Sequence, residues 1–284
     1  MTEPLTRATL GQFPLPQVVD GDKETKGQIL ILAGSRQVPG AALLCATAAM
    51  RAGAGKLQIA TGKSIAVQVG VTMPEAMVIG LDEHREGQLV PSAVAEISRL
   101  AADSDAIVGG PGLANGKVGA KIADALLETD AALVLDAALL HEMQPPRQQR
   151  PSLPILLPHA GELSSLLDCS EDDIARDPLG CGIRAAARYG ALVLVKGITS
   201  HIVTPGGQAW TYTGGVPGLG VSGSGDVLAG IVGGLLARGA DPLTALLWGV
   251  LLHGEAGESL SKKVGEIGFL TRELPEEIPA LLSR

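Results

Sequence analysis

Aromatic side chains are scarce in this chain, whose 284 residues include only two Trp, two Tyr and two Phe. A buried core must therefore consist mainly of Leu, Val, Ile and Ala, and the hydrophobic residues, which make up 46% of the chain, are sufficient for it. Cysteine is also rare, because Cys45, Cys169 and Cys181 are the only three and lack CxxC spacing. We therefore expect unpaired, small apolar thiols in a reduced, cytoplasmic compartment.

Long apolar runs, basic clusters and a leader sequence are missing as well. The longest uncharged run, from Gly197 to Gly225, is interrupted by Pro205, Pro217 and several glycines, so it does not predict a membrane helix of about 20 residues. The first residues, Met-Thr-Glu-Pro, do not begin a basic and then apolar segment, which argues against a secretory signal. The 22 basic and 30 acidic residues give a net charge of −8 without a lysine or arginine cluster, which argues against binding to nucleic acid.

Short apolar runs alternate with longer helical patterns, which predicts βαβ units and a largely parallel sheet. We expect strands over residues 28–33, 56–60, 76–79, 106–108, 132–135, 155–157 and 191–195. We expect helices over residues 40–52, 91–102, 117–128, 178–189, 226–238 and 242–257, and a hairpin of 200–204 with 208–212 around a Pro-Gly-Gly turn. Because no linker is visible, residues 26–284 should form a single domain, preceded by a loosely attached lead-in of residues 1–25.

Glycine is abundant, with 38 residues, and the strongest local signal is the glycine-rich segment 218–226. It leads into an apolar helical pattern, so the backbone N–H groups of Gly223, Ser224 and Gly225 should lie at a helix N-terminus, where anions bind. Asp226 beside such a phosphate cradle is placed to take a proton from an attacking hydroxyl. The alternative is a flexible turn in which Asp226 only caps the helix.

The predicted helix that follows this segment carries Gly230, Gly233 and Gly234 beside an apolar stripe. Each glycine costs a helix about 1 kcal/mol, so we expect another part of the chain to pack closely against the bare side. Both this helix and the next should be buried against the sheet.

Polar side chains follow several of the predicted strands, at the edge where ligands bind in open parallel sheets. Lys196 ends one strand and is the natural cation for a phosphate, and Ser35, Asp136 and His159 follow three others. Ser35 or Asp136 taken alone could equally cap the helix that comes next.

His159 and Glu162 are three residues apart, so both should lie on the first turn of one helix. No third nitrogen or sulfur ligand stands at the spacing of a zinc site. Glu162 better suits an indirect contact to Mg²⁺, which keeps its waters and binds substrate phosphates. His253 lies within an apolar helical pattern, and we interpret it as a hydrogen-bonded core histidine.

Over roughly residues 26–260, the chain resembles the NAD(P)H-hydrate dehydratase family of the ribokinase-like superfamily. The motifs that carry the resemblance occur in a fixed order. They are Gly34-Ser35 with Pro39-Gly-Ala-Ala42, Arg51-Ala-Gly-Ala-Gly55, Met73-Pro-Glu-Ala-Met77, Gly110-Pro-Gly112, Leu135-Asp-Ala137, Pro158-His-Ala-Gly-Glu162, Lys196-Gly197, Gly223-Ser-Gly-Asp226 and Leu252-His-Gly254.

The resemblance implies a three-layer α/β/α fold with a central, mostly parallel sheet. It also implies repair of the hydrated cofactors NADHX and NADPHX, a carbon–oxygen lyase reaction driven by ADP or ATP with Mg²⁺. The hydroxyl of the hydrate would be phosphorylated, and phosphate would then be eliminated to restore NADH or NADPH.

The family's functional residues fall on matching positions of this chain. By this resemblance, Asp226 is the base and Gly223, Ser224 and Gly225 form the anion hole. The nucleotide would contact Lys196, Gly197, Ile198, Thr199, Ser200 and Gly225. The hydrate would contact Ala41, Ala42, Gly112, His159 and Asp226, and Glu162 would help to place Mg²⁺.

The resemblance further implies a homotetramer and a separate partner protein that epimerises NAD(P)HX, because the chain has no room for the family's companion epimerase domain. Three positions depart from the family pattern: Ala138 replaces a second acid, Ala160 replaces a proline, and the segment around Val216 lacks the usual Asn and Thr. Two other functions stay open, namely a small-molecule kinase of the same superfamily, acting on a vitamin precursor or sugar alcohol, and a non-catalytic nucleotide sensor. Retention of both Asp226 and Lys196 argues against the sensor.

Overall fold

A single sheet runs through the computed structural model, which describes residues 2–17, 27–141, 143–148 and 150–283. Its ten strands are ordered β1-β10-β9-β8-β7-β6-β5-β2-β3-β4. They are β1 (Glu3–Pro4), β2 (Gln28–Leu32), β3 (Lys56–Gly62), β4 (Ala76–Leu81), β5 (Ala106–Gly109), β6 (Ala132–Leu135), β7 (Ile155–Leu156), β8 (Leu192–Val195), β9 (Ser200–Val203) and β10 (Ala209–Tyr212). The strands from β2 to β8 pair in parallel, and β9 and β10 form the expected antiparallel hairpin.

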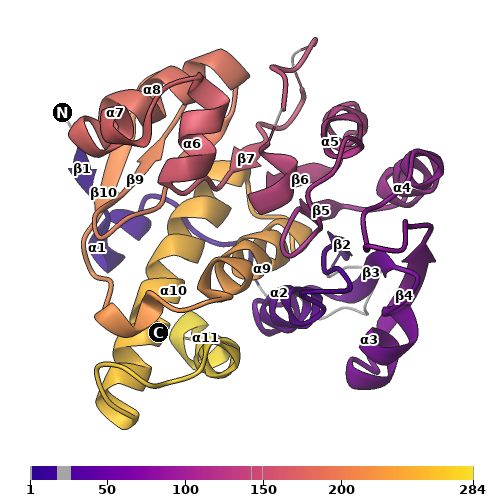
Figure 1. The fold of residues 1–284 in the computed structure, drawn as a ribbon. Helices are drawn as coiled ribbons and strands as arrows, with labels where there is room; N and C mark the ends of the chain where they lie inside the picture. Colours follow the sequence, from indigo (N-terminus) through magenta and orange to yellow (C-terminus); the bar gives the residue numbers. More distant parts are fainter. Residues whose placement is uncertain (1, 18–26, 142, 149, 284) are drawn as a thin grey trace.

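Helices cover both faces of the sheet (Figure 1). One face carries α1 (Arg7–Leu10), α2 (Gly40–Arg51), α3 (Ala66–Thr72), α9 (Ser224–Ala237), α10 (Pro242–Lys263) and α11 (Leu274–Leu282). The other carries α4 (Ser92–Ala102), α5 (Gly119–Leu127), α6 (Ala160–Leu167), α7 (Glu171–Arg176) and α8 (Pro178–Tyr189). Alternate side chains of β2 serve the two layers, since Ile29 and Ile31 join the first core while Leu30 and Leu32 join the second. The predicted three-layer α/β/α architecture is therefore confirmed.

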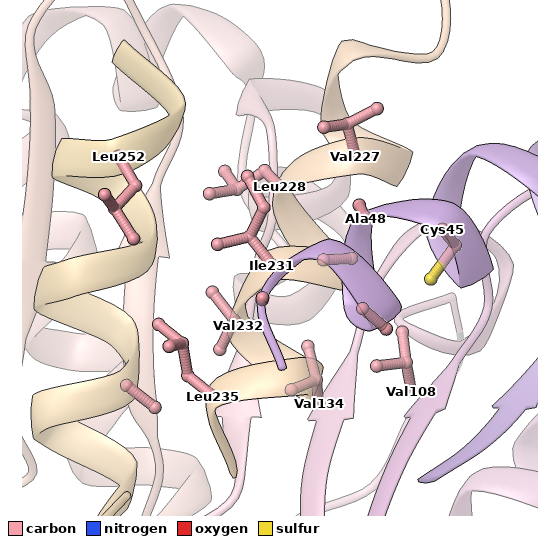
Figure 2. Close-up of a cluster of buried hydrophobic side chains, with 14 of the residues drawn as sticks. Cys45, Ala48, Val108, Val134, Val227, Leu228, Ile231, Val232, Leu235 and Leu252 are labelled. Carbon is pink, nitrogen blue, oxygen red and sulfur yellow. The ribbon is translucent and has the colours of Figure 1, made fainter. Parts of the chain in front are cut away.

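The glycine-bearing helix α9 passes between α2 and α10 (Figure 2). Leu228, Ile231, Val232 and Leu235 point toward α10 and the sheet, while α2 lies against the side that carries glycine. A Cβ added to Gly230 would overlap the carbonyl oxygen of Cys45 on α2. A Cβ added to Gly234 would likewise overlap the carbonyl oxygen of Ala49 on the same helix. The expectation of close packing against the bare side is confirmed.

The N-terminal segment is not loosely attached, in contrast to the prediction for residues 1–25. Over residues 2–17, β1 pairs in parallel with β10, and Leu5 and Leu10 are only 4% and 1% exposed. Arg7 forms an ion pair with Glu255 of α10 and donates a hydrogen bond to the Leu281 carbonyl at 3.0 Å. The sequence offered no signal for this docking, because the partners of the segment lie more than 200 residues further along the chain. Residues 18–25 of the predicted lead-in lie outside the described residues.

Two further expectations concern cysteine and membrane segments. All three cysteines are unpaired, as predicted, and Cys45 and Cys181 are buried in the core. Within the described residues, no helix combines the length and the apolar character needed to cross a bilayer.

Candidate active site

A cavity of about 790 Å³ lies at the carboxyl edge of the sheet, where β6, β7 and β8 end and where α9 begins. This is the edge at which open parallel sheets bind ligands. Nine of the site residues that the family resemblance implies line it. They are His159, Glu162, Lys196, Gly197, Ile198, Ser200, Ser224, Gly225 and Asp226.

Asp226 occupies the first turn of α9, directly after the glycine-rich segment. Gly223 has a φ of +87° and is the residue that turns the chain into the helix. Burial and, to a lesser extent, the nearby Asp136 raise the pKa of Asp226 from its ordinary value of 3.8 to about 6, although Lys196 opposes both effects. A carboxylate with a pKa near neutrality is an effective general base at physiological pH.

Lys196 lies at the centre of a buried group of charges. Its Nζ is 2.7 Å from Oδ1 of Asp136 and 3.9 Å from Oε2 of Glu162, and the two acidic side chains are only 3% and 5% exposed. A Cβ added to Gly225 would lie 3.6 Å from this ammonium group, so the lysine sits directly beside the glycine-rich segment. The N-terminal turn of α9 and one cation therefore lie at the same place, as phosphate binding requires, while the Ser224 N–H donates to the Val221 carbonyl at 3.2 Å.

Asp136 caps a helix, which was one of the two roles considered from the sequence, and it also lies in the cavity. Its Oδ1 accepts a hydrogen bond at 2.9 Å from the Ala137 N–H, so it caps the short 3₁₀ helix η1 (Ala137–Leu139). The same oxygen pairs with Lys196, and the side chain also lines the cavity. Ala137 has a φ of +49°, an uncommon value for a residue other than glycine, at the edge of this cavity.

His159 and Glu162 form a reciprocal cap at the start of α6. Nδ1 of His159 accepts hydrogen bonds from the N–H groups of Gly161 and Glu162 at 3.0 and 3.3 Å, which leaves the ring proton on Nε2, 3.2 Å from Oε1 of Glu162. Oε2 of Glu162 accepts a hydrogen bond from the His159 N–H at 2.8 Å. The first turn of α6 thus holds both side chains in fixed positions at the cavity wall.

The acidic residues of the cavity fit Mg²⁺ only in an indirect mode. Among the described residues, no cluster of three or more His, Cys, Asp or Glu side chains is arranged to hold a metal ion. Mg²⁺ needs only one or two carboxylates when it keeps its waters and binds nucleotide phosphates. Asp136 and Glu162, which flank Lys196, satisfy that lesser requirement.

Two cavity residues with polar side chains, His253 and Tyr212, received no functional role from the sequence. His253 on α10 is hydrogen-bonded to Ser224 at the start of α9, with 3.0 Å between Nε2 and Oγ. Burial lowers the pKa of His253 to about 4, so its imidazole is neutral near pH 7. Tyr212 at the end of β10 also lines the cavity, and its hydroxyl lies against Gly254. The Leu252-His-Gly254 motif was the available signal for His253, whereas nothing in the sequence pointed to Tyr212.

Five predicted site residues are not among those lining this cavity. Gly223 and Thr199 lie next in the chain to residues that do line it. Ala41, Ala42 and Gly112 gather instead beside the end of β2: the two alanines are 1% and 0% exposed, and a Cβ added to Gly112 would overlap that of Ala41. These three residues pack against each other, and their role in binding a hydrate stays a prediction.

A parallel sheet covered on both faces, with a glycine-lined helix N-terminus and a buried aspartate and lysine at its carboxyl edge, is typical of α/β enzymes that bind nucleotides. In agreement with this fold, the structure superimposes on a ribokinase-like superfamily protein from Enterococcus faecalis with a TM-score of 0.82, at 23% identity and over 99% of this chain and 95% of that one. The family model for NAD(P)H-hydrate dehydratase matches residues 29–280. The chain belongs to the NAD(P)H-hydrate dehydratase family.

Individual relatives agree with this assignment. The chain is 44% identical to an ADP-dependent (S)-NAD(P)H-hydrate dehydratase of Xanthomonas campestris, over 99% of this chain and 96% of the relative. It matches the crystal structure of an ADP/ATP-dependent NAD(P)H-hydrate dehydratase from Bacillus subtilis, co-crystallised with ATP and Mg²⁺, with a TM-score of 0.87 and 29% identity over 100% of this chain and 98% of the other. It spans about half the length of bifunctional NAD(P)H-hydrate repair enzymes, such as that of Gloeobacter violaceus, to which it is 36% identical over 93% of this chain and 51% of the relative.

Proposed function

We propose that this protein dehydrates NADHX and NADPHX to NADH and NADPH at the expense of ADP or ATP, with Asp226 as the catalytic base. The observation that carries the proposal is the position of Asp226, which stands at the glycine-lined N-terminus of α9 with Lys196 and Asp136 beside it. A kinase-like site of this kind can activate a hydroxyl toward a phosphoryl group. Hydroxide is a poor leaving group, and phosphorylation converts it into a good one.

The reaction follows from these positions in two steps. Asp226 takes the proton of the hydrate's hydroxyl while that oxygen attacks the terminal phosphorus of the nucleotide, so the bridging P–O bond breaks and AMP (from ADP) or ADP (from ATP) leaves. The backbone N–H groups of Gly223, Ser224 and Gly225 stabilise the charge that develops on the transferring phosphoryl group. The C–O bond then breaks, phosphate departs with the electron pair, and loss of a proton from the neighbouring ring carbon restores the dihydronicotinamide.

The nucleotide is proposed to lie along residues 196–200 and Gly225. Lys196 would pair with its phosphates, and Gly197, Thr199 and Ser200 would offer backbone and hydroxyl groups. Ile198, which is 99% exposed at the cavity, would give the adenine ring of the nucleotide an aliphatic surface. Mg²⁺, placed with help from Glu162, neutralises phosphate charge when bound.

The hydrate is proposed to contact His159 and Asp226, with Ala41, Ala42 and Gly112 shaping the floor of the adjoining rim. His159 is the best supported of these contacts, because its ring is 60% exposed at the cavity wall and held by its cap.

Several broader features are part of the same proposal. The chain would form a single domain that includes residues 2–17, in keeping with the one sheet to which β1 also belongs. A cytoplasmic location is supported by the three unpaired cysteines. A homotetramer is supported by the exposed apolar side chains of Val67, Val71 and Met77 at the β4 edge of the sheet. An NAD(P)HX epimerase would be a separate protein.

The decisive experiment combines the protein with Mg²⁺, authentic NADHX or NADPHX, and either ADP or ATP. We expect the absorbance of the dihydronicotinamide to return, with release of one phosphate per turnover. The absence of recovery with both nucleotides would refute the proposal. Accumulation of a phosphorylated product without elimination would instead identify a small-molecule kinase.

A further inference from the structure

A second, smaller cavity of about 320 Å³ lies where the loops that follow β2, β3 and β4 meet. Three of its residues are basic, namely Arg36 after β2, Lys63 after β3 and Arg85 after β4. We call this cavity the basic rim pocket. Neither the motifs nor the proposed catalytic groups make use of it.

The basic rim pocket lies on the same edge of the sheet as the catalytic cavity. β2 is flanked by β3 on one side and by β5 on the other, so the chain reverses its direction of winding between β2 and β5. Such a switch point is where doubly wound sheets bind ligands across their carboxyl edge. From β6, beside Asp136, to β3, beside Lys63, there are three strand spacings, or roughly 14 Å.

The loops that border the switch point are held together. The Gly34 N–H donates a hydrogen bond to the Pro111 carbonyl at 2.8 Å, which joins the loop after β2 to the loop after β5. Arg36 follows two residues later, so this hydrogen bond ties the loop that carries Arg36 to the loop after β5. A ligand that starts at Asp226 and crosses these loops reaches Arg36 first.

The catalytic cavity is too small for everything that the proposed reaction needs. A cleft of 300–1,000 Å³ typically holds one ligand of drug size. The proposed reaction brings together a nucleoside diphosphate or triphosphate and a dinucleotide, while the catalytic cavity measures about 790 Å³. If the nucleotide and the dihydronicotinamide occupy it, the adenylate half of the dinucleotide must lie outside, along the rim.

The charges of the basic rim pocket suit a phosphate. Nη1 of Arg36 donates a hydrogen bond to the Arg85 carbonyl at 2.8 Å, which orients this guanidinium. Within the described residues, its other N–H groups have no hydrogen-bond partner and can donate to a ligand. Lys63 is 74% exposed and only 3.7 Å from the exposed Asp82, a weak and easily screened pair.

The other acid of the pocket, Glu83, is held by the backbone of the loop after β3. Oε1 of Glu83 accepts a hydrogen bond from the Ser64 N–H at 2.6 Å. Oε2 is buried against Gly62, without a hydrogen-bond partner among the described residues. The three cations that line the pocket therefore outnumber its two carboxylates, Asp82 and Glu83.

We propose that the basic rim pocket binds a phosphate group in the adenylate half of the dinucleotide substrate, through Arg36, Lys63 and Arg85. This inference rests on the proposed function, because it takes NADHX and NADPHX as the substrates. The phosphate is either in the pyrophosphate, which both hydrates contain, or the 2′-phosphate, which only NADPHX contains.

The test compares the wild type with the Arg36→Gln/Lys63→Gln double variant in equilibrium binding of NADHX and NADPHX by calorimetry. Neither ADP nor ATP is added, so no phosphoryl donor is present and turnover is impossible. We expect the double variant to bind NADPHX about 5- to 20-fold more weakly, since it loses two charge-assisted contacts at a partly screened site. In the coupled assay the KM for the hydrate should rise by a similar factor, while kcat and the KM for ADP stay unchanged.

A Lys121→Gln/Lys262→Gln variant is the matched control, because it removes the same charge from two exposed residues away from both cavities. Weaker binding of both hydrates assigns the pocket to the pyrophosphate, and weaker binding of NADPHX alone assigns it to the 2′-phosphate. Unchanged affinity for both hydrates, or an equal loss in the control, overturns the inference.

The single variant Lys63→Gln guards against a folding defect, since it disturbs no hydrogen bond that holds a loop, and it should show part of the same loss. If the wild type binds both hydrates through the pocket but shows no turnover with either nucleotide, the proposed function fails while the pocket stands. If turnover is normal and the variants bind like the wild type, the pocket fails while the proposed function stands. A wild type that neither binds nor converts the hydrates refutes both.

Discussion

Replacing Asp226 with Asn should make the protein more stable and nearly inactive at the same time. The carboxyl group is largely buried beside Asp136, and its pKa is raised from 3.8 to about 6. Between these two pH values the folded protein keeps a proton that the unfolded chain has released. The fold therefore loses stability as the pH rises from 3.8 to about 6, carries the full penalty at higher pH, and is free of it below pH 3.8, where both states are protonated.

The magnitude follows from the same two pKa values. A tenfold change in an ionisation equilibrium corresponds to about 1.4 kcal/mol, so the charged carboxylate costs the fold roughly 3 kcal/mol near neutral pH. Asn cannot ionise and avoids this cost. For a chain of 284 residues, 3 kcal/mol corresponds to a rise in Tm of about 5 °C. Loss of the general base should lower kcat by at least roughly 100-fold.

Thermal unfolding at neutral pH and just below pH 4, followed by circular dichroism, measures the effect. We expect Asp226→Asn to be stabilised at neutral pH and to match the wild type at the lower pH. Asp172→Asn is the control, because Asp172 also lies in the first turn of a helix but is exposed. If the difference in stability between Asp226→Asn and the wild type is the same at both pH values, or if the variant keeps near-normal turnover, Asp226 is only a helix cap.

Three further predictions follow from the packing and charges. In Asp136→Asn, loss of the charge that raises the pKa of Asp226 should move the acid limb of the pH–rate profile, expected near pH 6 in the wild type, toward lower pH; an unmoved limb contradicts this coupling. Gly234→Ala should lose about 1–3 kcal/mol of unfolding free energy in urea, because the new methyl group would overlap the Ala49 carbonyl on α2, whereas Gly40→Ala, with open space around it, should lose nothing. Leu10→Ala should cost about 2–5 kcal/mol, against less than about 0.5 kcal/mol for the exposed Leu153→Ala, and equal stability of the two would refute a structural role for the N-terminal segment.

Local patterns predicted most of the layered fold. The alternation of apolar runs and helical stretches identified every strand from β2 to β8, because burial on both faces leaves a short apolar run wherever a central strand occurs, and the Pro-Gly-Gly turn identified the hairpin of β9 and β10. Asp241 before Pro242 predicted the start of α10, and its carboxylate accepts hydrogen bonds from the N–H groups of Leu243 and Thr244. The short elements β1, α1, α3, α7 and α11 were not predicted individually. β1, α1 and α11 contact distant parts of the chain, whereas α3 and α7 pack mainly on elements that adjoin them in sequence and are too short to show a clear helical pattern.

The scarcity of aromatic residues, the excess of glycine and the ordered motifs determined the kind of core, the phosphate cradle and the family. These properties are local, or reside in the order of residues along the chain. The strand-end rule also placed Lys196, Asp136 and His159 on one edge of the sheet.

Only the tertiary structure decided how these groups act on one another. Asp136 and Lys196 are 60 residues apart and Ser224 and His253 are 29 apart, yet each pair is in hydrogen-bond contact. The raised pKa of Asp226 depends on burial and on a charge brought by another strand, so no residue near it in sequence could reveal it. The order of the strands likewise placed the basic rim pocket across the switch point from the catalytic cavity. Distances between segments depend on how the whole chain packs, and packing is settled only when all the layers are assembled.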